Sequence, residues 1–132
     1  MRPTGAVRSF NIPVQDMARA SDFYREVLGW SIAPVQGSGG DYHRVLTAEA
    51  DGEGVAIERG TINGGLFRRG THGATATFLE VEVGSIDEVV RRVLQNGGRV
   101  VMEKRPMMDF AHFAIVQDPD GNHLGLMEYI DR

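Results

Sequence analysis

The sequence predicts an α+β protein built from two copies of a strand-helix-strand-strand-strand (βαβββ) module. Three observations support this prediction: a pattern that recurs after 69 residues, two amphipathic helix patterns that each follow an alternating strand, and short apolar runs separated by glycine-rich turns. We expect a single domain over residues 1–132, with the first module at 7–69 and the second at 75–129. With 132 residues, of which 42% are hydrophobic, the chain can bury a sizeable core.

The first module opens with an alternating segment. Phe10, Ile12 and Val14 alternate with polar or small residues, which is typical of a strand with two different faces. Asp16 is placed to cap the helix that follows, and Gly29 is placed to end it. The turn residues that follow delimit predicted strands at 30–35, 42–48, 54–58 and 65–67.

The second module repeats this order of elements. Leu79, Val81 and Val83 alternate with polar and aromatic residues, Ser85 can cap the next helix, and Asn96-Gly97-Gly98 ends it. Strands are predicted at 99–103, 111–117 and 123–129. The segment Asp118-Pro119-Asp120-Gly121-Asn122 has turn residues throughout, so the last two strands should form a hairpin.

Composition excludes several classes of function. The chain has no cysteine, which removes disulfide scaffolds, thiolate metal sites and cysteine nucleophiles. Its formal net charge of −4 offers no overall positive field for a nucleic acid. No stretch has the apolar length of a membrane span or signal peptide, so we expect a cytoplasmic protein with neither a nucleic acid nor a membrane as partner.

Several short motifs, taken in order, resemble the vicinal oxygen chelate superfamily, which includes glyoxalase, bleomycin-resistance proteins and extradiol dioxygenases. The resembling stretches are Phe10-Asn11-Ile12-Pro13-Val14-Gln15-Asp16, Arg19-Ala20, Phe23-Tyr24, Leu28-Gly29-Trp30, Ile62-Asn63-Gly64-Gly65-Leu66, Asn96-Gly97-Gly98, Asp118-Pro119-Asp120-Gly121-Asn122 and Gly125-Leu126. The resemblance implies a glyoxalase-like, or dioxygenase-like, fold in which two βαβββ modules form a curved mixed sheet around a cavity.

The resemblance also implies a test of metal binding, because enzymes of this superfamily chelate vicinal oxygens on a divalent cation. Carried onto this chain, the metal-ligand positions fall on Ser9, Glu58, Phe78 and Gly125. Only Glu58 is a competent ligand among these four. We therefore expect an incomplete metal site and no cofactor.

The leading hypothesis is a protein that binds a small organic molecule in the cup between its modules, as bleomycin-resistance proteins do. The pocket would combine apolar wall residues with a few orienting polar groups. The expected wall residues are Phe78, Met107, Met108, Phe110 and Met127, and the expected orienting groups are Asn11, Glu58, Glu80 and His112. No catalytic residue is predicted.

Two alternatives stay open. A lyase or isomerase of the glyoxalase type could hold a divalent metal on a rearranged set of Glu58, Glu80 and His123. Alternatively, the chain is an interaction module whose exposed sheet face makes a homodimer. In that case Glu80 is a solvated carboxylate or pairs with an arginine. The methionines of the predicted loop at 106–110 fit either a pocket lid or a contact between two copies of the chain, and we expect a homodimer.

Overall fold

A computed structural model of the chain describes residues 5–52 and 54–130. The described residues form two compact units. The N-terminal unit is Ser9–Thr77, and the C-terminal unit holds the residues from Phe78 onward together with the start of the chain up to Arg8. The module limits 7–69 and 75–129 stay a prediction, as does the cavity between the modules.

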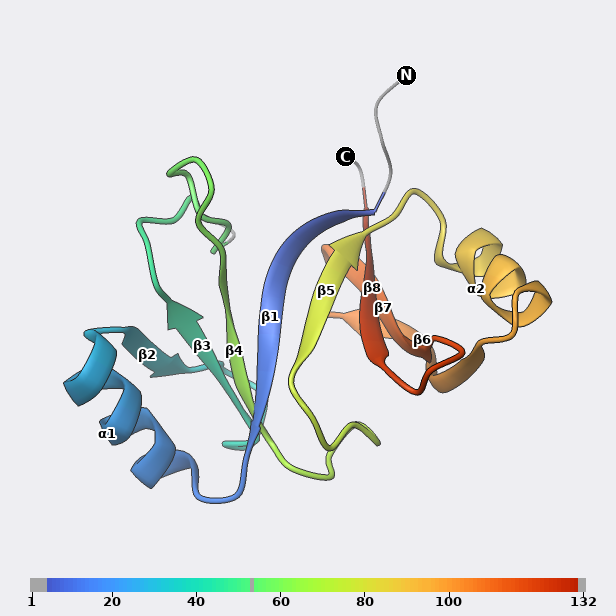
Figure 1. Cartoon of the computed structure of the whole chain (residues 1–132). Coiled ribbons are helices and arrows are strands. Elements are labelled where there is room, and N and C mark those ends of the chain that lie inside the picture. The colour runs from blue at the N-terminus through green and yellow to red at the C-terminus, as the bar shows by residue number, and fades with distance from the viewer. Residues whose placement is uncertain (1–4, 53, 131–132) are drawn as a thin grey trace. The chain divides into compact units, whose positions relative to one another are not determined.

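The N-terminal unit has the predicted βαβββ order (Figure 1). Its elements are β1 (Ala6–Val14), α1 (Met17–Leu28), β2 (Ser31–Pro34), β3 (Tyr42–Leu46) and β4 (Asn63–Arg68). The beginning of β1, up to Arg8, belongs to the C-terminal unit. In space the strands follow the order β2-β3-β4-β1, with β1 parallel to β4 and the other pairs antiparallel.

The C-terminal unit repeats this topology. Its elements are β5 (Phe78–Glu82), α2 (Ile86–Gln95), β6 (Arg99–Met107), β7 (Ala111–Gln117) and β8 (His123–Tyr129). The strand order β5-β8-β7-β6 is that of the N-terminal unit, with a parallel first pair and antiparallel pairs after it. The two βαβββ copies, the α+β class and the last hairpin are therefore confirmed.

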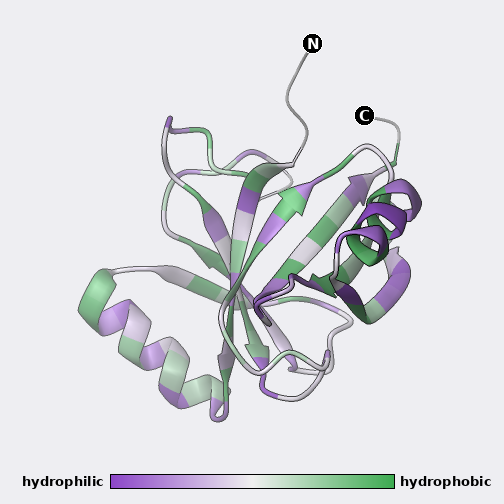
Figure 2. Ribbon diagram, turned by 45° about the vertical axis from the view of Figure 1, so that its right-hand side comes forward, coloured by the Kyte–Doolittle hydropathy of each residue, from purple (hydrophilic) through white to green (hydrophobic). Residues whose placement is uncertain are grey.

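Both helices begin and end where the sequence predicts. The Asp16 side chain accepts a hydrogen bond from the Arg19 amide at 3.0 Å, and Gly29 ends α1 with a φ of 70° that favours glycine. In α2 the Ser85 hydroxyl accepts from the Glu88 amide at 3.2 Å. Figure 2 shows that each helix has a hydrophilic and a hydrophobic side, so each covers one face of its own strands.

Each unit has its own core beneath its helix. In the N-terminal unit the core residues are Val14, Met17, Ile32, Val45 and Leu66, with Phe10, Ile12, Ala20, Tyr24 and Trp30 packed against them. In the C-terminal unit they are Val83, Ile86, Ala114, Val116 and Leu126, with Val81, Val89, Val90, Val93 and Leu124. Phe10, Ile12 and Val14 thus turn toward the helix, as their alternation predicts.

Three predicted segments differ from the structure. The expected strand at 54–58 is a loop with one isolated bridge, Ala50 to Ala56, because Gly54 turns the chain with a φ of 83°. The loop expected at 106–110 is shorter, since β6 runs on through two register shifts to Met107. The strand expected at 65–67 begins two residues earlier, since Asn63 and Gly64 already belong to β4.

Candidate functional site

The strand face that turns away from α1 in the N-terminal unit carries a short row of polar groups. Asn11, Gly65 and Arg44 lie side by side on β1, β4 and β3. They alternate with the core residues that face α1, so their side chains belong to the opposite face. We call this the Asn11 face.

Asn11 is the buried polar group of this face. Its side chain is part of a residue only 4% exposed, and its Oδ1 accepts a hydrogen bond from the Tyr42 hydroxyl at 3.3 Å. The Nδ2 atom has no hydrogen-bond partner within the described part of the chain. A buried donor without an acceptor lowers the stability of a fold by about 1–3 kcal/mol. The Asn11 amide therefore has an N–H group that could donate to a bound molecule.

Gly65 is the reason that Tyr42 reaches Asn11. A Cβ atom on Gly65 would lie 2.1 Å from the Tyr42 hydroxyl oxygen, so the tyrosine ring occupies the space that any other residue would fill. The sequence did not indicate Tyr42 or Gly65 as site residues. The alternation in β3 places Tyr42 on the face of Arg44, but the close approach depends on the pairing of β3 with β4.

The strand face that turns away from α2 in the C-terminal unit holds one buried carboxylate, Glu80. Phe78, Glu80 and Met127 are all buried, with 5%, 8% and 4% of their surface exposed. Glu80 lies beside Gly125, and Ile115 follows on the next strand. We call this the Glu80 face, and Glu80 has at least one partner in the folded chain.

Gly125 gives the Glu80 face its shape. A Cβ atom at this position would lie 3.0 Å from Cε2 of Phe78 and 3.2 Å from Cγ of Glu80. Both side chains therefore pack across the bare backbone of β8. A larger residue at position 125 would displace them.

The other predicted polar groups do not all join these faces. His112 lies beside Glu128 and in phase with Ala114 and Val116, which face α2. Glu128 accepts a hydrogen bond from the Ile86 amide at 2.7 Å, so this corner caps the helix. Glu58 is exposed in the loop before β4, where its carbonyl oxygen accepts from Thr61.

The predicted apolar wall residues near 106–110 gather at one hairpin. Met107 ends β6 opposite Ala111, while Met108 and Phe110 lie in the turn. Met108 has a φ of 52° and is 61% exposed, and the Phe110 ring stacks on Tyr129 with centroids 6.3 Å apart. The hairpin thus holds Phe110 over β8 and leaves Met108 in solvent.

A divalent metal does not fit the residues described. Glu80 and His123 share the Glu80 face, but no group of three His, Cys, Asp or Glu side chains in residues 5–52 and 54–130 is arranged to hold an ion. Two ligands are fewer than the three protein ligands that catalytic zinc sites use.

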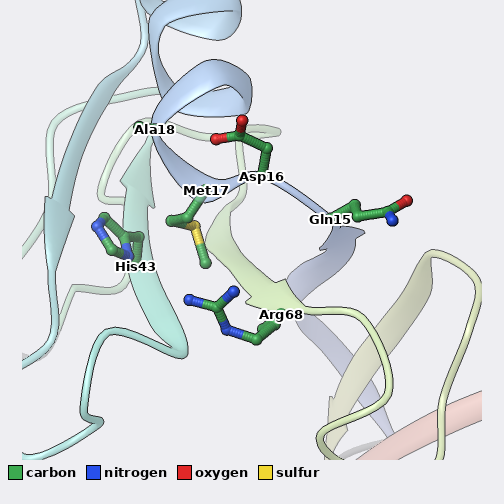
Figure 3. Close-up of a pocket in the computed structure, with 6 residues that line it drawn as sticks. All are labelled: Gln15, Asp16, Met17, Ala18, His43 and Arg68. Carbon is green, nitrogen blue, oxygen red and sulfur yellow. The ribbon is translucent and has the colours of Figure 1, made fainter.

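A shallow hollow of about 530 Å³ lies at the beginning of α1. Figure 3 shows the His43 ring, the Met17 thioether and the Arg68 guanidinium around it. Arg68 is already paired with Asp41 at 2.7 Å, and Asp16 caps the helix there. The sequence did not indicate this hollow, and two of its polar groups, Arg68 and Asp16, serve the fold.

The turn that resembles the superfamily also has a structural role. The side-chain amide of Asn122, followed by the backbone amides of Asn122, Asp120 and Gly121, holds the pKa of Asp118 below its ordinary value of 3.8. The ionised carboxylate thus closes the turn between β7 and β8. Asp118 has no part in either face.

Comparison with known proteins agrees with this architecture. The family model of the Glyoxalase/Bleomycin resistance protein/Dioxygenase superfamily matches residues 6–126, and the chain belongs to this superfamily.

In the part of the chain that the structure describes, neither helix has the length and apolar character of a membrane span.

Among curated proteins, the chain is 29% identical over 120 residues to "Putative glyoxylase CFP32" of Mycobacterium bovis. It is also 29% identical over 125 residues to the anthracycline biosynthesis protein DauV of a Streptomyces species. Each alignment covers 89% of this chain but only 43% and 44% of those relatives, so the chain spans less than half of their length.

Solved structures share the fold at low sequence identity. Methylmalonyl-CoA epimerase from Mycobacterium tuberculosis matches with a TM-score of 0.61 and 18% identity, over 97% of this chain and 92% of that one. A superfamily member from Vibrio splendidus matches with a TM-score of 0.61 and 14% identity, over 92% and 97%.

Proposed function

We propose that this chain binds a small organic molecule against the strand faces that turn away from its helices, and that it does so without a metal ion. The observation that carries the proposal is the Glu80 face. It places one buried carboxylate, which has a partner in the folded chain, among the apolar side chains of Phe78 and Met127. An apolar wall with a few polar groups is the usual form of a small-molecule site.

The comparisons support the same class of function. Bleomycin-resistance proteins belong to the superfamily that matches this chain, and one relative is named for anthracycline biosynthesis. An anthracycline is therefore the first probe to use, and methylmalonyl-CoA is the second because of the epimerase fold.

Thermal unfolding of the chelator-treated protein tests this proposal. With doxorubicin at about 100 times its Kd, binding adds about 2.7 kcal/mol to the free energy of unfolding. For a chain of this size that gain corresponds to a rise in Tm of roughly 10 °C. If neither probe raises the Tm of the chelator-treated protein, the proposal is wrong.

Glu80→Gln separates a binding role from a structural role. The glutamine keeps the volume and hydrogen-bonding capacity but removes the charge, so we expect the ligand-induced rise in Tm to fall while the Tm of the free protein changes little. Glu103→Gln changes an exposed carboxylate of the same unit and should leave both values as they are. A loss of stability in Glu80→Gln with unchanged binding would make Glu80 structural.

The second candidate is the metal-dependent lyase or isomerase of the glyoxalase type. It rests on the shared face of Glu80 and His123 in the C-terminal unit. Glu58, the third ligand of this alternative, belongs to the N-terminal unit. Metal analysis of protein purified without chelator distinguishes the two functions. Near-stoichiometric metal that is lost in Glu58→Ala would support the enzyme and overturn the proposal above.

A further inference from the structure

We infer that the Asn11 face is a subsite for the acidic oxygen group of an aromatic carboxylate. The inference rests on the proposed function and deepens it, because it assigns a chemical class to the bound molecule. It depends only on residues of the N-terminal unit, and on two kinds of hydrogen-bond donor that lie in one row across three neighbouring strands.

The first donor is the side-chain amide of Asn11. Its Nδ2 atom is buried and has no acceptor among the residues that the structure describes. The Tyr42 hydroxyl is bonded to Oδ1, which leaves the amide N–H groups to a different acceptor. An oxygen atom of a bound molecule would supply that acceptor.

The second donor is the guanidinium group of Arg44. Arg44 is exposed, and its side chain has no hydrogen bond or ion pair with another residue in the described ranges. A guanidinium group presents its N–H donors in a planar fork that matches a carboxylate. Its positive charge favours an anionic ligand over a neutral one.

Gly65 separates the two donors, and the Tyr42 ring occupies the space above it. Because Arg44 and Asn11 flank Gly65 on neighbouring strands, their Cα atoms lie about 10 Å apart. A long arginine side chain can close part of that distance. The Tyr42 ring above Gly65 offers an aromatic surface beside both donors, which favours a planar ring as the rest of the ligand.

A matched pair of probes tests this inference: 2-naphthoate and its neutral analogue 2-naphthamide, with affinities measured by isothermal titration calorimetry. Both have a carbonyl oxygen for Asn11, but only naphthoate has a charge for Arg44. We expect naphthoate to bind about tenfold more tightly, and this preference to fall when the NaCl concentration is raised.

Two substitutions assign the donors. Arg44→Met should weaken naphthoate binding about tenfold and leave naphthamide binding unchanged, since it removes the charge from an exposed position. Asn11→Leu should weaken both probes, because it removes the shared donor. Arg19→Met, which removes an exposed charge from α1, is the matched control and should change neither affinity.

The failure of this inference can be told from failure of the proposed function. Equal binding of the two probes, or an unchanged preference in Arg44→Met, would overturn the subsite. Binding of doxorubicin without binding of either naphthalene probe would also overturn it, yet would leave the proposed function in place. If Asn11→Leu does not fold, the Arg44→Met comparison decides the result alone.

Discussion

The side-chain amide of Asn63 holds the loop before β4 against the end of β3. Its Oδ1 accepts hydrogen bonds from the amides of Thr47 and Ala48 at 2.7 and 3.0 Å. Its Nδ2 donates to the carbonyl oxygens of Ala48 and Gly54, both at 3.2 Å. Asn63 is 3% exposed, so this buried amide has partners for both its donor and its acceptor. Asn11, which lies on the same face, keeps an unpaired donor, and this contrast distinguishes a structural amide from a candidate for binding.

Asn63→Ala should therefore lower the free energy of unfolding by about 3 kcal/mol, because it leaves buried backbone groups without partners. Urea unfolding followed by circular dichroism measures this change. Asn96→Ala removes an exposed side-chain hydrogen bond to the Arg92 carbonyl and should cost less than about 1 kcal/mol. Similar costs for the two variants would contradict the structural role of Asn63.

At the scale of elements, β4 carries two adjacent glycines with opposite environments. Gly64 pairs with Phe10 of the parallel strand β1, and a Cβ atom there would lie 2.2 Å from the Phe10 carbonyl oxygen. Gly65 faces the other side, where the nearest atom is the hydroxyl of Tyr42. Backbone cannot move aside as the end of a side chain can, so the two positions should respond differently to substitution.

Gly64→Ala should destabilise the protein by about 2 kcal/mol or more, since it forces β1 and β4 apart. Gly65→Ala should lower the free energy of unfolding by less, because the Tyr42 ring can rotate away. It should also weaken the binding of 2-naphthoate. Urea unfolding and calorimetry measure the two effects. Equal destabilisation by both variants would show that Tyr42 is as immovable as backbone.

At the scale of the whole molecule, an ion pair joins the start of the chain to a strand far along the sequence. Nε of Arg8 lies 2.8 Å from Oε1 of Glu82, and the two side chains are 32% and 21% exposed. The Gly5 amide also donates to the Glu82 carbonyl oxygen at 2.9 Å. The beginning of β1 is thereby held to β5 within the C-terminal unit, although 74 positions separate Arg8 from Glu82.

A double-mutant cycle with Arg8→Met and Glu82→Gln should give a coupling energy of about 0.5–1 kcal/mol that decreases in high salt. The pair Arg25 and Asp22 on α1 is more exposed, so its coupling should be about 0.3 kcal/mol. A coupling no larger than that of the helix pair would mean that Arg8 does not stabilise the C-terminal unit.

The predicted homodimer is tested by sedimentation at micromolar protein concentration.

The sequence by itself determined the helices, their caps and most of the strands, because these depend on residues close together in the chain. Asp16, Ser85 and Gly29 act on the turn beside them, and alternation places Phe10 and Ile12 toward α1. The predicted polar set could not be assigned to one face in this way. In β7 the residues of both faces are buried, so alternation did not show that His112 points toward α2.

Only the tertiary structure decided which side chains meet across strands. Tyr42 lies over Gly65 because β3 pairs with β4 in one register, and Glu80 lies over Gly125 because β5 pairs with β8. A shift of one residue in either pairing would turn these side chains to the opposite face. Register between distant strands follows from the packing of the whole unit, and short stretches of sequence do not carry that information.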